Sequence, residues 1–268
     1  MKSLLIKHPV ITYCLVCLLF TVLLGIANMF LFPSSVDYML LFPQWAPTLS
    51  AILIVCTISK RSEIRILFQG LSLRKSNLKW SCIAVVIPIL TCGISYIILS
   101  LSEYKQWTSP ELNRSFGNYI ICLFAIILGS CGEEIGCRGF MLSQLNKKYT
   151  LFVSSLFVGL YWGLWHLKFH SGILIFFLYA FLVIEFSLII SWLWSKTRNN
   201  IISAIIFHSS VNLCSLIFFE NIISDPSNHH LQILLYGIYV SVFTIPCIFI
   251  VKNMLLAQRL SNKENNLK

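Results

Sequence analysis

Residues 118–142 carry the sequence NYIICLFAIILGSCGEEIGCRGFML, in which two glutamates and an arginine stand inside a run of apolar residues. A helix needs about 20 largely apolar residues to cross the hydrocarbon core of a bilayer, and this stretch supplies them. The rest of the chain has the same character, because 57% of all residues are hydrophobic, 11% are charged and the mean hydropathy is +0.80. The sequence therefore predicts a membrane protein and not a water-soluble domain.

On both sides of this stretch the chain offers further apolar segments of spanning length, about eight in all, although the pattern is also compatible with seven or nine. We expect spans at 10–32, 41–59, 79–101, 118–142, 151–168, 172–195, 200–219 and 231–251. No internal repeat, low-complexity tract or long linker divides the chain. The expected fold is an all-α polytopic bundle forming a single transmembrane domain over residues 1–268.

The formal net charge of +10 reflects topology better than nucleic-acid binding. If the amino terminus lies inside, every Lys and Arg residue falls in a cytoplasmic segment except Lys105, Arg114, Arg138 and Lys168. This asymmetry follows the positive-inside rule and predicts that both termini are cytoplasmic. We therefore expect membrane lipid, and not nucleic acid, around the protein. The ten Cys residues lie mostly inside apolar spans without ordered spacing, so they are expected to pack and not to form disulfides.

Ionisable groups inside the predicted spans are expensive, since a charge at mid-bilayer costs roughly 2.5–3.5 kcal/mol on insertion scales. In the fourth span Arg138 follows Glu134 by four residues, so on a helix the two stack on one face and can form an ion pair. Glu133 is turned by about 100° to a neighbouring face. A carboxylate without its own cation in a low-dielectric cavity is suited to take a proton from water, which makes Glu133 the candidate general base. The structural alternative is that these Glu and Arg side chains form a buried ion pair that only stabilises the helix bundle.

Two later spans carry polar groups at helical spacing. Trp162 and His166 share a face of the fifth span, and His208 and Asn212 share a face of the seventh. A lone membrane histidine is often only bonded to a neighbouring carbonyl, whereas a His and an Asn stacked in lipid indicate a site. By these boundaries Glu133 and His208 lie at similar depth, but His166 lies further from the cytoplasmic end.

Three motifs follow one another on separate spans: Glu133-Glu134-x-x-x-Arg138, Trp162-x-x-x-His166 and His208-x-x-x-Asn212. In this order they resemble the CAAX protease and bacteriocin-processing family, also called Abi, and especially its bacterial members. The family usually has Phe at the position of Trp162. The resemblance covers about residues 118–215, the expected core of the site, whereas the first three spans carry no matching motif.

The resemblance implies an intramembrane endopeptidase with a polar cavity between its helices, open mainly to the cytosol, in a bacterial plasma membrane. Water activated at Glu133 would attack a peptide bond, while His166, His208 and Asn212 would position water and stabilise the oxyanion. The catalytic residues are then Glu133, Glu134, His166, His208 and Asn212, with Arg138 as the supporting ion-pair partner.

A metal is the open point in this chemistry. Glu133, His166 and His208 would suffice to hold zinc with water in the fourth position. The sequence has no HExxH motif, however, and a glutamate pair with a histidine and an amide donor suffices for general-base catalysis with an oxyanion site. We therefore expect no metal or other cofactor and keep zinc as the alternative.

The expected substrate is a membrane-associated or lipidated peptide or protein, whose identity the sequence does not give. The alternative function is a bacteriocin immunity or resistance protein that uses the same cavity without cleaving. A secondary transporter would show inverted repeats and helices broken in both halves, which the sequence lacks. Glu185 lies in the sixth span outside the three motifs, where it either lines the same cavity or makes a structural hydrogen bond. The oligomeric state does not follow from the sequence.

Overall fold

The computed structural model describes residues 7–31, 41–58, 64, 67–68, 70–72, 77–102, 115–166, 171–224 and 228–266. This part of the chain is almost entirely helical and contains no strand. Among the described residues, six helices are long and apolar enough to cross a membrane: α2 (Pro9–Leu31), α6 (Leu78–Ser100), α7 with its continuation (Phe116–Leu145), α10 (Ile173–Lys196), α11 (Ile202–Ile223) and α12 (His229–Asn266). Two shorter apolar helices are α4 (Ala46–Ile58) and α9 (Leu151–Trp165). The all-α polytopic prediction is confirmed, with a helix at each expected span.

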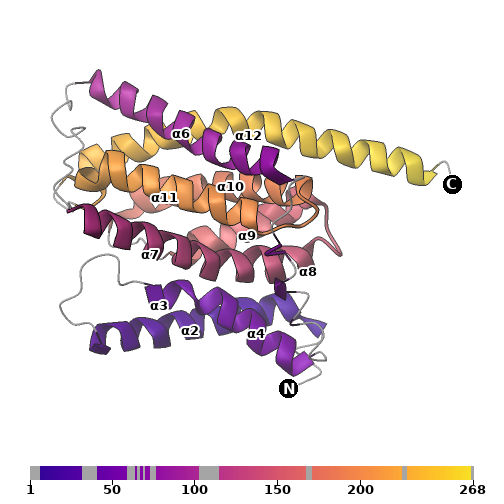
Figure 1. Cartoon of the computed structure of the whole chain (residues 1–268). Helices are drawn as coiled ribbons and strands as arrows, with labels where there is room; N and C mark the ends of the chain where they lie inside the picture. The colour runs from indigo at the N-terminus through magenta and orange to yellow at the C-terminus, as the bar shows by residue number, and fades with distance from the viewer. Residues whose placement is uncertain are drawn as a thin grey trace.

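Two expected spans differ from the helices that form there. The segment expected at 41–59 is split, because α3 (Leu41–Gln44) ends before Trp45 and α4 begins at Ala46. Pro47 explains the restart, since proline lacks an N–H and fits a helix only in its first turn. At the other end of the chain, α12 runs 38 residues to Asn266, far beyond the expected end at 251. It extends past the rest of the bundle in Figure 1.

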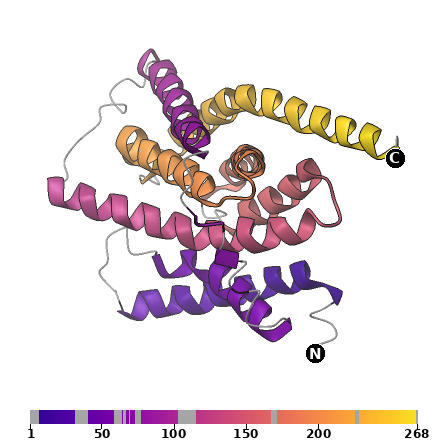
Figure 2. The same cartoon turned by 45° about the vertical axis from the view of Figure 1, so that its right-hand side comes forward.

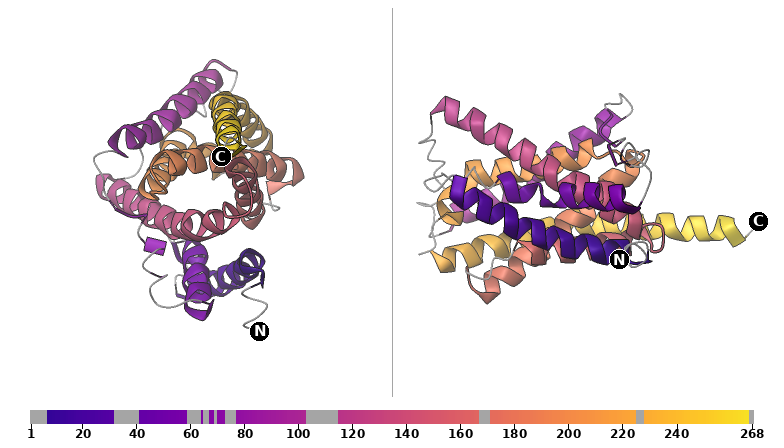
Figure 3. Two further views of the ribbon diagram at one scale, coloured as in Figure 1. Left: turned by 90° about the vertical axis from the view of Figure 1, so that its right-hand side faces the viewer. Right: turned by 90° about the horizontal axis from the view of Figure 1, so that it is seen from below.

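The helices form a ring-shaped bundle with an additional layer on one side. Helix α10 packs against α9 and α12, while α11 packs against α6 and α7. Seen end-on in Figure 3, these helices surround a common interior. Helices α2, α3 and α4 form the additional layer beneath α7 in Figures 1 and 2, and α4 also contacts the segment that follows α7.

Glycines allow the helices that carry the polar residues to approach closely. A Cβ atom added at Gly159 would lie 2.8 Å from the Cα of Ile184, and one at Gly163 would lie 3.0 Å from the Cα of Ala180, so α9 and α10 are in backbone contact. A Cβ at Gly136 would overlap the backbone of Pro47 at the start of α4. Small residues permit such contacts between membrane helices.

Aromatic residues fill the interior between α10, α11 and α12. The ring of Phe186 lies 6.0 Å from that of Phe207 and 4.8 Å from that of Phe243, centroid to centroid, both at steep angles. Offset and edge-on ring pairs of this kind stabilise a core beyond the area they bury. Many large apolar side chains point outward instead, such as Phe30 and Phe249, as expected where lipid covers the surface.

Candidate active site

The two adjacent glutamates stand where one helix changes its winding. Glu133 and Glu134 end α7 (Phe116–Glu134), and the chain continues as the π-helix η4 (Ile135–Leu142) before the short α8 (Ser143–Leu145). The span expected at 118–142 is therefore present, but its winding is α-helical only as far as Glu134. Thr48 of α4 donates its hydroxyl proton to the Gly132 carbonyl just before this change. Short π-helical segments within α-helices are frequent at functional sites.

Glu134 binds two positively chargeable groups through one oxygen. Arg138 Nη1 donates to Glu134 Oε1 at 3.0 Å, as the spacing of four predicted, and both side chains are fully buried. His208 Nδ1, from α11, lies 3.0 Å from the same oxygen. In the described part of the chain, Glu134 Oε2 and the Nε and Nη2 atoms of Arg138 have no hydrogen-bond partner. Buried polar atoms of this kind call for ordered water or a polar ligand.

Glu133 is held by a different residue. Its Oε2 accepts a hydrogen bond from the indole Nε1 of Trp162 on α9 at 2.7 Å, and the side chain is only 2% exposed. Arg138 is instead bonded to Glu134. The expected division between one paired glutamate and one without its own arginine is therefore present in the structure.

Trp162 lies at the centre of the polar cluster. Its ring lies 4.6 Å from the guanidinium carbon of Arg138, within the range of a cation–π interaction. The same ring meets the His208 ring edge-on, with the centroids 5.0 Å apart. One indole therefore touches the base candidate, the buried cation and the histidine of α11.

His166 lies one helical turn beyond Trp162, at the carboxyl end of α9. Its Nδ1 lies 2.7 Å from the Trp162 carbonyl oxygen, and its ring packs edge-on against Trp165 and against Tyr179 of α10. His166 was expected to lie deeper in the membrane than Glu133, and the site does extend along α9. Trp162, one turn before His166, is the α9 side chain that contacts Glu133.

Asn212 follows His208 by one turn of α11 and is half-buried. Within the described residues its side chain makes no hydrogen bond, so its amide is not committed to the bundle. His208, at 7% exposure, is the α11 residue in direct contact with the glutamates.

The zinc alternative does not fit this arrangement. Over the described residues, no three His, Cys, Asp or Glu side chains are grouped so that they could hold a metal ion. His208 turns Nδ1 to Glu134, and His166 turns Nδ1 to the carbonyl of its own helix. The set Glu133, His166 and His208 is therefore not arranged around one point.

Comparison with known proteins places these residues in a family. A family model described as type II CAAX prenyl endopeptidase Rce1-like matches residues 115–214. The chain is also 30% identical over 189 residues to CAAX prenyl protease 2 of Methanococcus maripaludis, a match that covers 62% of this chain and 69% of the relative. This chain belongs to the CAAX prenyl endopeptidase family. It is accordingly a protease, and its apolar helices make it an integral membrane protein.

The family match spans α7 to the first half of α11 and so includes the whole cluster. Within this membrane protease, Trp162 is the residue whose contribution the sequence interpretation missed. The sequence marks Trp162 only as a replacement for the usual Phe, but in the structure its indole N–H donates to Glu133. The signal was available, because an indole N–H buried among apolar helices needs an acceptor, and a carboxylate was predicted nearby.

Glu185 lies apart from the cluster. Its Oε1 accepts a hydrogen bond from the Thr244 hydroxyl of α12 at 2.6 Å, and the Cys247 thiol approaches its backbone carbonyl at 3.4 Å. Of the two readings of this residue, the structural hydrogen bond is the one the structure contains.

Proposed function

We propose that this membrane protease cleaves a peptide bond with water activated by Glu133. The observation that carries the proposal is that the two glutamates have different partners. Arg138 and His208 are bound to Glu134, whereas Glu133 accepts a hydrogen bond from the neutral indole N–H of Trp162. A carboxylate neutralised by an arginine is a poor base, so Glu133 is the better proton acceptor of the pair.

Glu134 acts by positioning the groups around it. Its carboxylate holds Arg138 on its own helix and fixes the ring of His208 on α11, both at 3.0 Å. A histidine whose Nδ1–H donates to a carboxylate presents Nε2 in a fixed direction, as in other catalytic sites. We assign to the doubly protonated His208 ring the donation from Nε2 to the oxyanion that forms when water adds to the scissile carbonyl.

Asn212 supplies the second oxyanion donor. It shares a face of α11 with His208, one turn away, and its amide makes no hydrogen bond to any described residue. Two donors on one rigid helix, aimed at the place where charge develops, are the arrangement that stabilises an acyl-transfer transition state.

His166 positions the attacking water from the other side. The carbonyl of Trp162 accepts the Nδ1 proton, so Nε2 carries the lone pair in the neutral ring. Such a nitrogen accepts a hydrogen bond from water and orients it toward the carboxylate. No step of this mechanism uses a metal.

The proposed substrate is a membrane-associated peptide or a prenylated protein. The relative from Methanococcus maripaludis is named a CAAX prenyl protease, which supports a prenylated protein as the first substrate class to test. We also propose that both termini, and the nearer opening of the site, face the cytoplasm of a bacterial cell. The start of α2 and the end of α12 lie at the same end of the bundle as α8, in support of this topology (Figures 1 and 3).

The test replaces Glu133 with Gln, which keeps the shape but removes the base. We expect cleavage of a farnesylated peptide in proteoliposomes to fall about 10²- to 10⁴-fold, the usual contribution of general-base catalysis. Comparison of membrane-peptide profiles from cells expressing the wild type and Glu133→Gln identifies other substrates, because an uncleaved precursor accumulates only with the variant.

The matched control is Glu185→Gln, another buried glutamate in an apolar helix. It should keep cleavage within about threefold of the wild type, as expected for a residue outside the site. Full turnover by a folded Glu133→Gln protein would refute the assignment. Protection against a bacteriocin that survives this substitution would favour the non-cleaving immunity function.

A further inference from the structure

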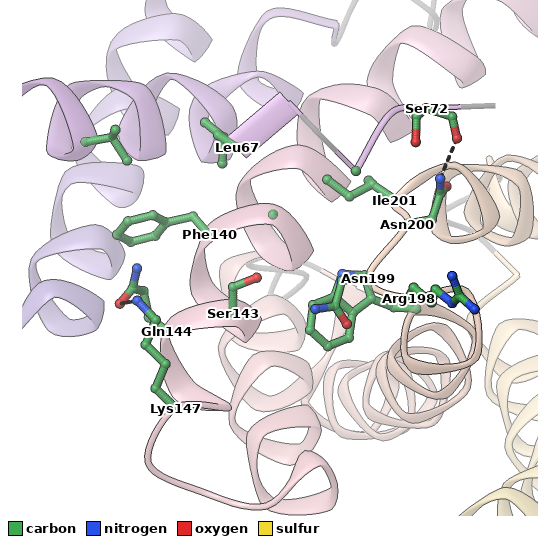
Figure 4. Close-up of a pocket in the computed structure, with 14 residues that line it drawn as sticks. Leu67, Ser72, Phe140, Ser143, Gln144, Lys147, Arg198, Asn199, Asn200 and Ile201 are labelled. Carbon is green, nitrogen blue, oxygen red and sulfur yellow. Dashed lines mark hydrogen bonds between the residues drawn. The ribbon is translucent and has the colours of Figure 1, made fainter. Parts of the chain in front are cut away.

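A second feature, separate from the polar cluster, is a cavity of about 450 Å³ at the end of the bundle where α8 lies. Four parts of the chain line it: Val55 of α4; Leu67, Gly70 and Ser72; Gly139, Phe140, Ser143, Gln144 and Lys147 from η4 to just beyond α8; and Trp194 of α10 with residues 198–201. Figure 4 shows the residues that line the cavity, drawn from these separate parts of the chain.

Two hydrogen bonds join the segment that holds Gly70 and Ser72 to the turn before α11. The Ile201 backbone N–H donates to the Gly70 carbonyl at 2.7 Å, and the Asn200 side-chain amide donates to the Ser72 carbonyl at 2.6 Å (Figure 4). A Cβ at Gly70 would lie 2.7 Å from the Ile201 side chain, so this contact needs glycine. The cavity wall is therefore a built structure.

The lining is apolar on one side and polar and cationic on the other. Leu67, Phe140 and Trp194 supply apolar surface, while Lys147 and Arg198 supply two positive charges. The lining residues, all in the described part of the chain, include no Asp or Glu. The Nζ of Lys147 is bonded to the neutral Gln144 side chain at 3.1 Å, so its charge is not neutralised there. The cavity thus has a positive field without an internal counter-ion.

The backbone around Arg198 is unusual. Arg198 and Asn199 follow one another with φ of 55° and 63°, the left-handed conformation that non-glycine residues seldom adopt. Asn tolerates it, but Arg is not among the residues that favour it. Backbone strain of this kind concentrates at ligand clamps. In Figure 4 this turn places Arg198 and Asn199 across the cavity from Gln144 and Lys147.

The cations also stand at the level where the apolar helices end. Lys147 comes two residues after the end of α8, and Arg198 two residues after the end of α10. Basic residues at such positions meet lipid headgroups at the membrane surface. We infer that this cavity binds the phosphate group of an anionic membrane lipid, with the phosphate between Lys147 and Arg198 and the first acyl carbons against the apolar wall. Free phosphate shares the charge but has nothing to place against that wall.

Binding at this place acts on the helix of the glutamates. Gly139 and Phe140 line the cavity and directly follow Arg138, which is bonded to Glu134. A bound lipid therefore stabilises η4 in the conformation that holds the ion pair. This consequence for cleavage rests on the proposed function, whereas the binding itself does not.

The experiment titrates the purified full-length protein in neutral detergent with phosphatidylglycerol and counts bound lipids by native mass spectrometry. The double variant Lys147→Gln/Arg198→Gln removes both cations without disturbing buried groups, since both residues are exposed. We expect its affinity for the first bound phosphatidylglycerol to fall about thirtyfold. The control Lys252→Gln/Arg259→Gln removes equal charge from exposed positions of α12 outside the cavity and should change the affinity less than about threefold.

Two further binding measurements identify the ligand. Phosphatidylcholine, which has a phosphate but no net charge, should bind the wild type more weakly than phosphatidylglycerol, and millimolar inorganic phosphate should not displace the bound lipid. Equal binding of the two lipids, unchanged binding by Lys147→Gln/Arg198→Gln, or displacement by inorganic phosphate would each overturn the inference. Cleavage is not measured in this test, so its result is independent of that for Glu133→Gln.

Discussion

Two glutamates buried in apolar helices of this protein have very different surroundings. Glu133 is 2% exposed and Glu185 is 3% exposed, so both are equally hidden from solvent. Glu133 lies beside a second glutamate and accepts an indole N–H, within a cluster that also holds an arginine and a histidine. Glu185 accepts one hydroxyl, that of Thr244, and its Oε2 has no hydrogen-bond partner among the described residues.

The difference shows what distinguishes a reactive carboxyl group from a structural one in a membrane. Burial alone is costly in both places and does not decide between them. Around Glu133, the neighbours from α9 and α11 are themselves polar and fix one another, which gives a site its geometry. Around the Glu185 carboxylate, a single neutral donor, the Thr244 hydroxyl, joins α10 to α12, a contact that stabilises packing.

Loss of the cation should have the largest effect on stability. In Arg138→Leu, Glu134 keeps only His208, and a carboxylate remains buried without its guanidinium. Removal of one member of a buried ion pair costs about 3–5 kcal/mol. Unfolding in mixed detergent micelles measures this free energy, and Arg259→Leu, at an exposed position of α12, should change it by less than about 0.5 kcal/mol.

A double substitution separates charge from packing in this cluster. Glu134→Gln/Arg138→Leu removes both charges, so it should be more stable than the sum of the single substitutions, by about 0.5–3 kcal/mol. Strict additivity would mean that Arg138 contributes only through its packing against Trp162, and the contrast with Glu185 would then lose its electrostatic basis.

Sequence patterns predicted the contacts of this cluster that lie within a single helix. The spacing of Glu134 and Arg138 predicted their ion pair, and the apolar segments predicted each membrane helix. Contacts between helices depend on how each helix is rotated, which periodicity does not fix. His208 therefore turned out to bind Glu134 and not Glu133, and the partner of Glu185 lies 59 residues away on α12.

The apolar sequence pattern also does not predict the change from α-helix to π-helix at η4. A π-helix keeps the same apolar sequence as an α-helix, and its stability depends on contacts such as the approach of Pro47 to Gly136. Gly132 and Gly136 permit close packing, but the residues that they meet, Gln44 and Pro47, lie more than 80 residues earlier in the sequence.

An intermediate effect is expected from the indole that holds Glu133. Trp162→Phe keeps an aromatic ring against Arg138 and His208 but removes the N–H that donates to Glu133. A hydrogen bond to a charged group contributes about 1.5–3 kcal/mol, so kcat should fall at least about tenfold. KM should stay within about twofold, because Trp162 positions the base and does not bind the substrate.

Trp165→Phe is the matched control for this substitution. Trp165 also stands on α9 and also donates its indole N–H, but to the Thr21 hydroxyl of α2 at 2.7 Å. Its loss should affect stability and leave kcat unchanged. Equal decreases in kcat for both variants would show that α9 responds to any lost indole contact, and Trp162 would have no special relation to Glu133.

The smallest effect is expected at the other glutamate. Thr244→Val keeps the shape of the side chain and removes the hydroxyl that donates to Glu185 Oε1 at 2.6 Å. The free energy of unfolding should fall by about 1 kcal/mol, the net contribution of one hydrogen bond, while kcat stays unchanged. Ser241→Ala removes a hydroxyl of α12 that bonds only to its own helix at Gly237 and should alter neither quantity. If Thr244→Val lowered kcat as much as Trp162→Phe, Glu185 would belong to the active site, and the two glutamates would be parts of one extended cluster.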